Sequence, residues 1–145
     1  YLLLERGPYV IAAGLDESIA GEPKTLHGRF VNLFDSELRV QETIRIAPGE
    51  RYFLRDLNAV RRREPHVLAS ACKALVTGRE DKSLTLVVEG VARTPAVVLL
   101  HTKQKPSSIT LEDQPVQSFE YSAADGLLWI RFENEARPRP LSITF

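Results

Sequence analysis

The sequence contains few of the residues that build cross-linked or redox-active sites. It has one cysteine, Cys72, one tryptophan, Trp129, and no methionine among 145 residues. A single cysteine forms no intrachain disulfide and no cysteine-based metal site. It fits a reducing compartment but also allows secretion, so the compartment is left undetermined.

The sequence also lacks an excess of charge and a long apolar run. Nineteen basic residues balance nineteen acidic ones, and the net charge is zero. This balance argues against a general electrostatic grip on nucleic acid or on an anionic membrane. The densest basic run, Arg61-Arg62-Arg63, is followed directly by Glu64 and Pro65 and is interpreted as a solvated loop. With no apolar run of about 18 residues and no signal peptide, we expect neither a nucleic-acid nor a membrane partner.

Motifs for catalysis, cofactors and metals are missing as well. The three histidines, His27, His66 and His101, stand outside helical or hairpin ligand spacing, which argues against zinc or copper. There is no Gly-x-Ser-x-Gly elbow and no glycine-rich phosphate loop. We therefore expect no catalytic residue, no cofactor and no metal ligand, and a chain that is not itself an enzyme.

Carboxylates cluster at three places: Asp16 with Glu17, Asp35 with Glu37, and Glu112 with Asp113. Such pairs suit acid/base work or Ca²⁺. Each pair falls where a turn is expected, so solvated turn residues are the favoured interpretation. A calcium ion in one of these loops is the alternative.

Short alternating segments predict an all-β fold. Residues 38–46 alternate apolar and polar side chains, as a half-buried antiparallel strand does. Residues 107–132 predict three short strands, the last two joined by an Asp125-Gly126 hairpin turn. Residues 96–101 are apolar on both faces, which predicts a central strand. Residues 66–76 fit either a helical stripe or a strand, and strands on both sides favour a strand.

About ten to twelve short strands follow from this pattern. They predict an antiparallel, immunoglobulin-like β-sandwich of two packed sheets. With no internal repeat, we expect one domain over residues 1–145. Because the chain has no methionine and opens on Tyr1-Leu2-Leu3-Leu4, like the middle of a strand, we expect a domain cut from a longer protein.

Trp129 is the most informative aromatic residue. On the strand 127–132, Leu128, Ile130 and Phe132 share one face, and Trp129 lies opposite with Leu127 and Arg131. If the first set faces the core, the second set is available for packing against another domain or for stacking on a sugar; alternatively, it is covered within the domain. Tyr9, Tyr52 and Tyr121 are predicted to lie at the edge of the core.

Several segments resemble the C-terminal β-sandwich domains of bacterial glycoside hydrolases. They are residues 106–116, the strand Phe119-Glu120-Tyr121, the segment 125–132, and the turns at Arg6-Gly7-Pro8-Tyr9, Leu33-Phe34-Asp35 and 48–51. Asp113-Gln114 departs from the pattern, because glycine often follows the aspartate there.

In that family the catalytic carboxylates belong to a preceding barrel domain. The resemblance therefore implies a non-catalytic accessory domain that braces the catalytic domain of the same parent chain through an apolar face. A self-association partner is the other expected occupant of that face. Trp129, Leu127 and Arg131 are the candidate contacts. The alternative is a carbohydrate-binding module with an exposed aromatic surface.

Overall fold

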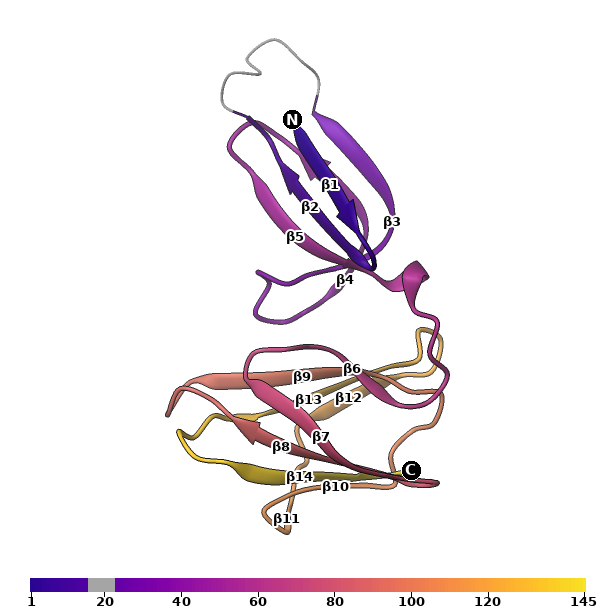
Figure 1. The fold of residues 1–145 in the computed structure, drawn as a ribbon, viewed down its shortest axis with the longest axis vertical. Helices are drawn as coiled ribbons and strands as arrows, with labels where there is room; N and C mark the ends of the chain where they lie inside the picture. Colours follow the sequence, from indigo (N-terminus) through magenta and orange to yellow (C-terminus); the bar gives the residue numbers. More distant parts are fainter. Residues whose placement is uncertain (16–22) are drawn as a thin grey trace. The chain divides into compact units, whose positions relative to one another are not determined.

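The computed structural model describes residues 1–15 and 23–145, and the chain divides into two compact units (Figure 1). The first unit is Tyr1–Arg61 and the second is Arg62–Phe145. The predicted all-β class is confirmed: the described residues form fourteen strands and one short 3-10 turn. That is more strands than the ten to twelve expected. The sequence predicted one domain, whereas the contacts fall into two units, and each is described separately below.

The first unit is one antiparallel sheet with the order β1-β2-β5-β3-β4. Its strands are β1 (Leu2–Arg6), β2 (Tyr9–Ala13), β3 (Lys24–Asn32), β4 (Val40–Ile46) and β5 (Arg51–Asp56), followed by the 3-10 turn η1 (Leu57–Ala59). Alternate residues of these strands build one core, which contains Val10, Ala12, Phe30, Ile44, Ile46 and Leu54. The inward alternation predicted for residues 38–46 is confirmed at Ile44 and Ile46.

The second unit contains the predicted β-sandwich. One sheet has the order β11-β10-β14-β8-β7 and the other β12-β13-β9-β6. The strands are β6 (His66–Ser70), β7 (Lys73–Glu80), β8 (Ser83–Glu89), β9 (Pro95–His101), β10 (Ser108–Leu111), β11 (Gln114–Pro115), β12 (Phe119–Ser122), β13 (Leu127–Glu133) and β14 (Arg139–Thr144). All the strand pairs are antiparallel.

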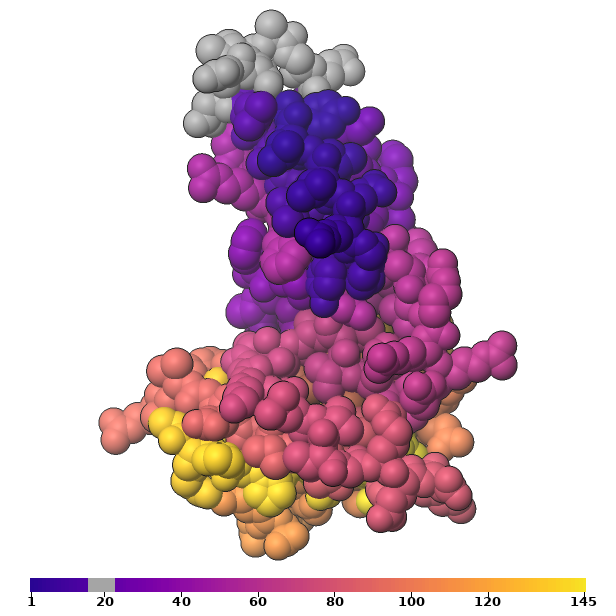
Figure 2. All heavy atoms as spheres, viewed as in Figure 1, coloured from indigo at the N-terminus to yellow at the C-terminus, as the bar shows by residue number. Residues whose placement is uncertain are grey.

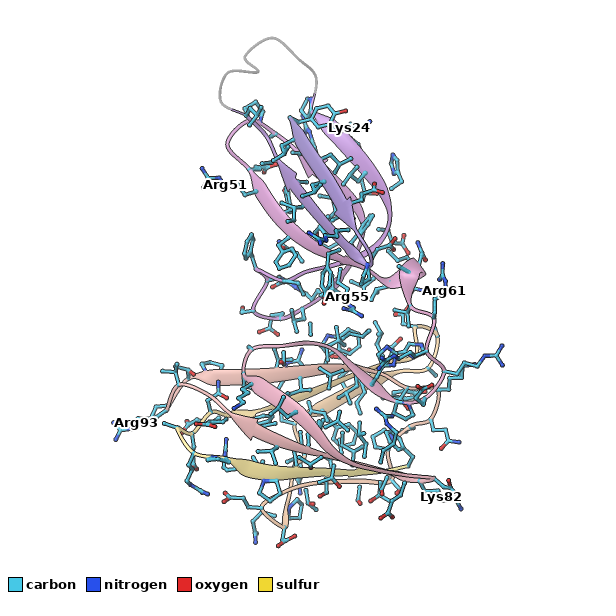
Figure 3. All side chains as sticks on the ribbon, viewed as in Figure 1. Lys24, Arg51, Arg55, Arg61, Lys82 and Arg93 are labelled. Atoms are coloured by element: carbon cyan, nitrogen blue, oxygen red, sulfur yellow. The ribbon has the colours of Figure 1, made fainter. Side chains whose placement is uncertain are left out.

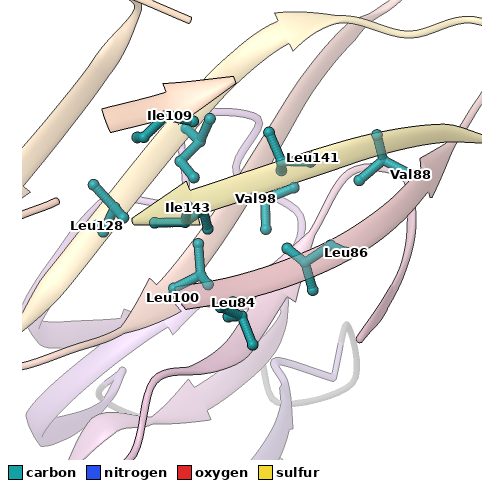
Figure 4. Close-up of a cluster of buried hydrophobic side chains, with 10 residues drawn as sticks. Leu84, Leu86, Val88, Val98, Leu100, Ile109, Leu128, Leu141 and Ile143 are labelled. Carbon is teal, nitrogen blue, oxygen red and sulfur yellow. The ribbon is translucent and has the colours of Figure 1, made fainter. Parts of the chain in front are cut away.

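Both sheets of the second unit contribute to one core (Figure 4). Leu84, Leu86 and Val88 enter it from β8, and Leu141 and Ile143 from β14. The facing sheet adds Val98 and Leu100 from β9, and Leu128 and Ile130 from β13. Period-two alternation on each strand sends these side chains to the same layer.

Two further strand predictions are confirmed. Residues 66–76 form strands β6 and β7, which are interrupted at Ala71 and Cys72. Strand β9 is a central strand between β13 and β6, and Ala96 to Leu100 are all buried. A run that is apolar on both faces is thus buried on both faces.

The Asp125-Gly126 pair closes a longer loop than a two-residue hairpin turn. Ser122 pairs with Leu127, so four residues separate β12 from β13. The Gly126 N–H donates to the Ser122 carbonyl at 2.8 Å, and Gly126 has φ +65°. Of these two residues, only Gly126 adopts a left-handed backbone conformation, which glycine reaches without steric cost.

In the described part of the chain, no helix has the length and apolar character needed to cross a bilayer.

Candidate functional site

The structure places the three sequence-predicted residues on one face of β13. Leu128 and Ile130 belong to the sandwich core, so Leu127, Trp129 and Arg131 lie on the opposite face of the sheet. Trp129 is directly opposite Leu99 of β9 and Glu120 of β12, and Arg131 is opposite Val97. The division of faces predicted for this strand is therefore confirmed.

This face of β13 is not exposed. Trp129 is 7% exposed and Leu127 is 1% exposed, while Arg131 is half-buried. The Trp129 ring thus offers almost no free surface on which a sugar ring can stack. A role for these three residues at an interface stays a prediction.

An exposed apolar face lies instead on the first unit, on strands β1, β2 and β5. Since Leu3, Val10, Ala12 and Leu54 pack into the core, the alternate residues point outward. We call them the outer face; they form three rows across the strands: Leu2, Ala13 and Arg51; Leu4, Ile11 and Phe53; Arg6, Tyr9 and Arg55. In Figure 2 the indigo side chains of the N-terminal strands lie at the surface of this unit.

The outer face has an aliphatic half that is well exposed to solvent. Leu2 and Leu4 are each 52% exposed and Ile11 is 42% exposed. They come from β1, an edge strand of the sheet, and from its neighbour β2. Contiguous apolar surface of this kind marks an interaction site more often than a scattered exposed leucine does.

The aromatic half of the outer face consists of Tyr9 and Phe53, together with Phe34 from the turn after β3. The ring centroids of Tyr9 and Phe53 are 5.6 Å apart, and those of Phe53 and Phe34 are 6.3 Å apart. Both pairs are tilted, within the usual separation for interacting rings. Phe34 is 68% exposed and Tyr9 36% exposed. Tyr9 thus lies on an open surface, unlike Tyr52, which packs against the core as expected.

Three arginines border the outer face, and no aspartate or glutamate belongs to it. The Arg55 guanidinium lies 5.2 Å from the centre of the Tyr9 ring, and its Nη1 donates to the Tyr9 hydroxyl at 2.9 Å. Figure 3 labels Arg51 and Arg55 at opposite ends of β5. Among the described residues, Arg6, Arg51 and Arg55 form no ion pair.

Two of the three carboxylate pairs lie in turns, as predicted. Asp35 accepts hydrogen bonds from the Glu37 N–H at 3.0 Å and from the Arg39 N–H at 3.2 Å. Burial raises the pKa of Asp35, but these hydrogen bonds and the Arg39 side chain outweigh it and hold the pKa below its usual value. Glu112 pairs with Arg137. Asp16 and Glu17 lie outside the described residues.

Two histidines that are far apart in the sequence meet on adjacent strands. His66 of β6 is directly opposite His101 of β9, with ring centroids 5.5 Å apart. His66 Nδ1 is 2.9 Å from the Glu64 carbonyl oxygen, and His101 Nδ1 is buried without a hydrogen-bond partner. Burial, with His66 and Lys103 nearby, lowers the pKa of His101. Sequence spacing could not reveal this pair, because strand register brings it together.

The described residues contain neither a cluster of metal ligands nor an activated thiol. Within residues 1–15 and 23–145, no three His, Cys, Asp or Glu side chains are grouped to hold a metal. Burial raises the pKa of the Cys72 thiol more than nearby Arg139 lowers it. A raised pKa leaves less thiolate at neutral pH, which is the nucleophilic form.

A shallow depression of about 420 Å³ lies at one end of the sandwich. Glu64, Glu80, Asp81 and Arg79 contribute to its lining, and Arg79 donates to the Pro65 carbonyl. Ser83 also lines the depression, and among the described residues its hydroxyl is hydrogen-bonded to none of these carboxylates, so we assign the depression no chemistry.

Comparison with known proteins gives no family. No family model matches the sequence, and no curated protein matches it. A solved structure, the uncharacterized protein lmo2446 from Listeria monocytogenes EGD-e, aligns with 94% of this chain at 9% identity and a TM-score of 0.30. The chain spans 18% of the length of that protein. A likeness this low carries no argument about fold or function.

Proposed function

We propose that this chain is a non-catalytic, immunoglobulin-like β-sandwich accessory module of a carbohydrate-active enzyme, and that it braces a catalytic domain. The observation that supports the proposal is the aliphatic half of the outer face, where Leu2, Leu4 and Ile11 are each at least 42% exposed. Covering these side chains with a neighbouring domain removes apolar surface from water. The resemblance to glycoside-hydrolase tail domains suggests that the partner is the catalytic domain of a glycoside hydrolase.

The size of the effect follows from the area that is covered. Apolar burial stabilises by about 25 cal/mol per Å², and a standard protein interface covers roughly 800 Å² on each partner. The aliphatic half of the outer face, formed by Leu2, Leu4 and Ile11, contributes the apolar part of such a contact. The position of β1 at the sheet edge leaves its side chains open to a partner.

The test is the substitution Leu4→Lys, made both in the full-length parent enzyme and in the 145-residue chain. In the parent we expect the catalytic domain to lose activity at a lower temperature, because a buried apolar contact is replaced by a charge. In the isolated chain, we expect the substitution to abolish any self-association, which analytical ultracentrifugation measures.

Val91→Lys is the matched control, since Val91 belongs to the second unit rather than to the outer face and is 72% exposed. We expect it to leave both measurements unchanged. Equal thermal inactivation of the parent enzyme with and without Leu4→Lys would count against the bracing role. A parent reading frame without a catalytic domain would count against it too.

A carbohydrate-binding module is the second candidate function, and the aromatic half of the outer face supports it. Phe34, Phe53 and Tyr9 form a chain of rings at the surface, and sugar rings bind to such faces by stacking. These rings replace Trp129, whose side chain is buried. Titration with several glycan classes, with Phe34→Ala as the variant, tests this candidate; no binding to any class contradicts it.

A further inference from the structure

We propose that the aromatic half of the outer face, with its arginines, binds an acidic polysaccharide through the carboxylates of its uronate residues. This inference rests on the second candidate function, carbohydrate binding, and names the class of sugar. It follows from the positions of the arginines, the contacts that hold Arg55, and the absence of carboxylates from the outer face.

The cations flank the aromatic residues in the row formed by Arg6, Tyr9 and Arg55. Tyr9 of β2 has Arg6 of β1 on one side and Arg55 of β5 on the other. Directly opposed residues of adjacent strands lie about 5 Å apart. A sugar bound at this row therefore lies close to two arginines.

Arg55 is held in position before any ligand arrives. Its Nη1 donates to the Tyr9 hydroxyl, and its guanidinium stacks over the Tyr9 ring at 5.2 Å. Holding the side chain in one orientation reduces the conformational entropy lost on binding. The planar guanidinium matches a carboxylate, to which it donates two parallel hydrogen bonds.

The rows of the outer face carry arginines and no carboxylate, although the whole chain is neutral. Arg6, Arg51 and Arg55 supply three positive charges, no carboxylate belongs to the face, and none of the three forms an ion pair within the described residues. A neutral glycan leaves these charges unused. A uronate uses them together with the rings, because each sugar unit carries both a pyranose face and a carboxylate.

Phe34 extends the surface beyond the sheet. It lies next to Phe53 and is 68% exposed, so the rings of Tyr9, Phe53 and Phe34 form a continuous series. A series of stacking rings suits a polymer of several sugar units better than a single sugar.

The experiment measures binding of the 145-residue chain to polygalacturonate and to its fully methyl-esterified form, by calorimetry. The two polymers share their sugar and differ in charge. We expect the esterified polymer to bind at least tenfold more weakly, with about tenfold losses for Phe34→Ala and for Arg55→Gln on polygalacturonate. The affinity should fall as salt rises.

Val91→Ala and Arg62→Gln are the matched controls for a lost apolar side chain and a lost charge, since both residues are exposed in the second unit. They should bind polygalacturonate as the unmodified chain does. Thermal unfolding of every variant confirms that exposed substitutions leave the fold intact.

Four outcomes overturn the proposal in distinguishable ways. Equal affinity for both polymers, with the Phe34→Ala loss retained, removes the carboxylate specificity and leaves carbohydrate binding standing. Binding only to neutral glycans does the same. Binding that follows charge alone, with dextran sulfate equal to polygalacturonate and Phe34→Ala without effect, indicates nonspecific attraction. No binding to any glycan overturns both this inference and the second candidate function.

Discussion

Asn134 shows at the residue scale how a buried polar side chain joins parts of the second unit. It is 2% exposed. Its amide nitrogen donates to the Thr94 hydroxyl at 3.1 Å, to the Ala71 carbonyl at 3.3 Å and to the Pro95 carbonyl at 3.5 Å. These bonds join the end of β13 to the β6–β7 connection and to the start of β9.

We expect Asn134→Asp to destabilise the protein by about 1–3 kcal/mol, because a carboxylate donates none of these hydrogen bonds and is buried beside their acceptors. Urea unfolding measures the change. Asn58→Asp is the control, since Asn58 is exposed. A change below about 0.5 kcal/mol at Asn134, the size typical of a surface substitution, would contradict this role.

We expect His101 to make the free energy of unfolding depend on pH. Its pKa is lowered from 6.5 by burial, with His66 and Lys103 adding to the effect, so the unfolded chain binds a proton more readily than the folded one. Its contribution is therefore fully present above pH 6.5 and is lost as the pH falls from there towards the folded-state pKa.

Unfolding free energies measured between pH 8 and pH 5 test this assignment. We expect the decline on acidification to be shallower in His101→Gln than in the unmodified chain. His27→Gln should keep the original decline, because His27 is exposed. If His101→Gln and the unmodified chain decline in parallel, His101 is not the titrating group.

At the scale of elements, alternation predicted the strands and left their orientation open. Strand β2 shows the reason. Val10 and Ala12 form one apolar set and Tyr9 and Ile11 another, so the sequence cannot say which set faces water. The core of the first unit takes Val10 and Ala12. The outer face is thus set by packing between strands that are distant in the sequence.

Trp129 illustrates the same limit from the other direction. Its face of β13 followed correctly from the alternation with Leu128 and Ile130. The alternation did not predict that Trp129 is buried, because burial depends on which residues cover that face of the sheet. The His66–His101 pair depends on the register of β6 against β9, which residue spacing does not encode.

The β10–β11 turn is a local departure from favoured turn chemistry. Its two central residues, Glu112 and Asp113, have φ of +51° and +63°. Positive φ costs an ordinary residue roughly 1–2 kcal/mol, whereas glycine adopts it without that cost.

We expect Asp113→Gly to stabilise the protein by about 0.5–1 kcal/mol, because it removes this cost at an exposed turn. Glu112 keeps its pairing with Arg137 in this variant. Thermal unfolding measures the gain. A lower midpoint than that of the unmodified chain would show that Asp113 is not strained.

At the scale of the whole molecule, the described residues contain two clusters of packed core side chains. One is in the sheet of the first unit and the other in the sandwich of the second. The sequence predicts one domain because it contains no internal repeat. The boundary between the units falls at Arg61 and Arg62, inside the arginine run that was interpreted as a solvated loop.

Two cores predict two calorimetric transitions for the 145-residue chain, because each unit has its own cooperative set of contacts. Ile44→Ala, in the core of the first unit, should lower one transition and leave the other in place. One two-state transition, lowered as a whole by Ile44→Ala, would instead indicate the single domain predicted from the sequence.

The central claim is that the aliphatic half of the outer face, formed by Leu2, Leu4 and Ile11, packs against a catalytic domain, and hydroxyl-radical footprinting tests it most directly. The 145-residue chain and the full-length parent enzyme are oxidised under the same conditions. We predict that oxidation of Leu4 and Ile11 is strongly reduced in the parent while Val91 is oxidised equally in both. Equal oxidation of Leu4 and Ile11 in the two proteins would contradict the account.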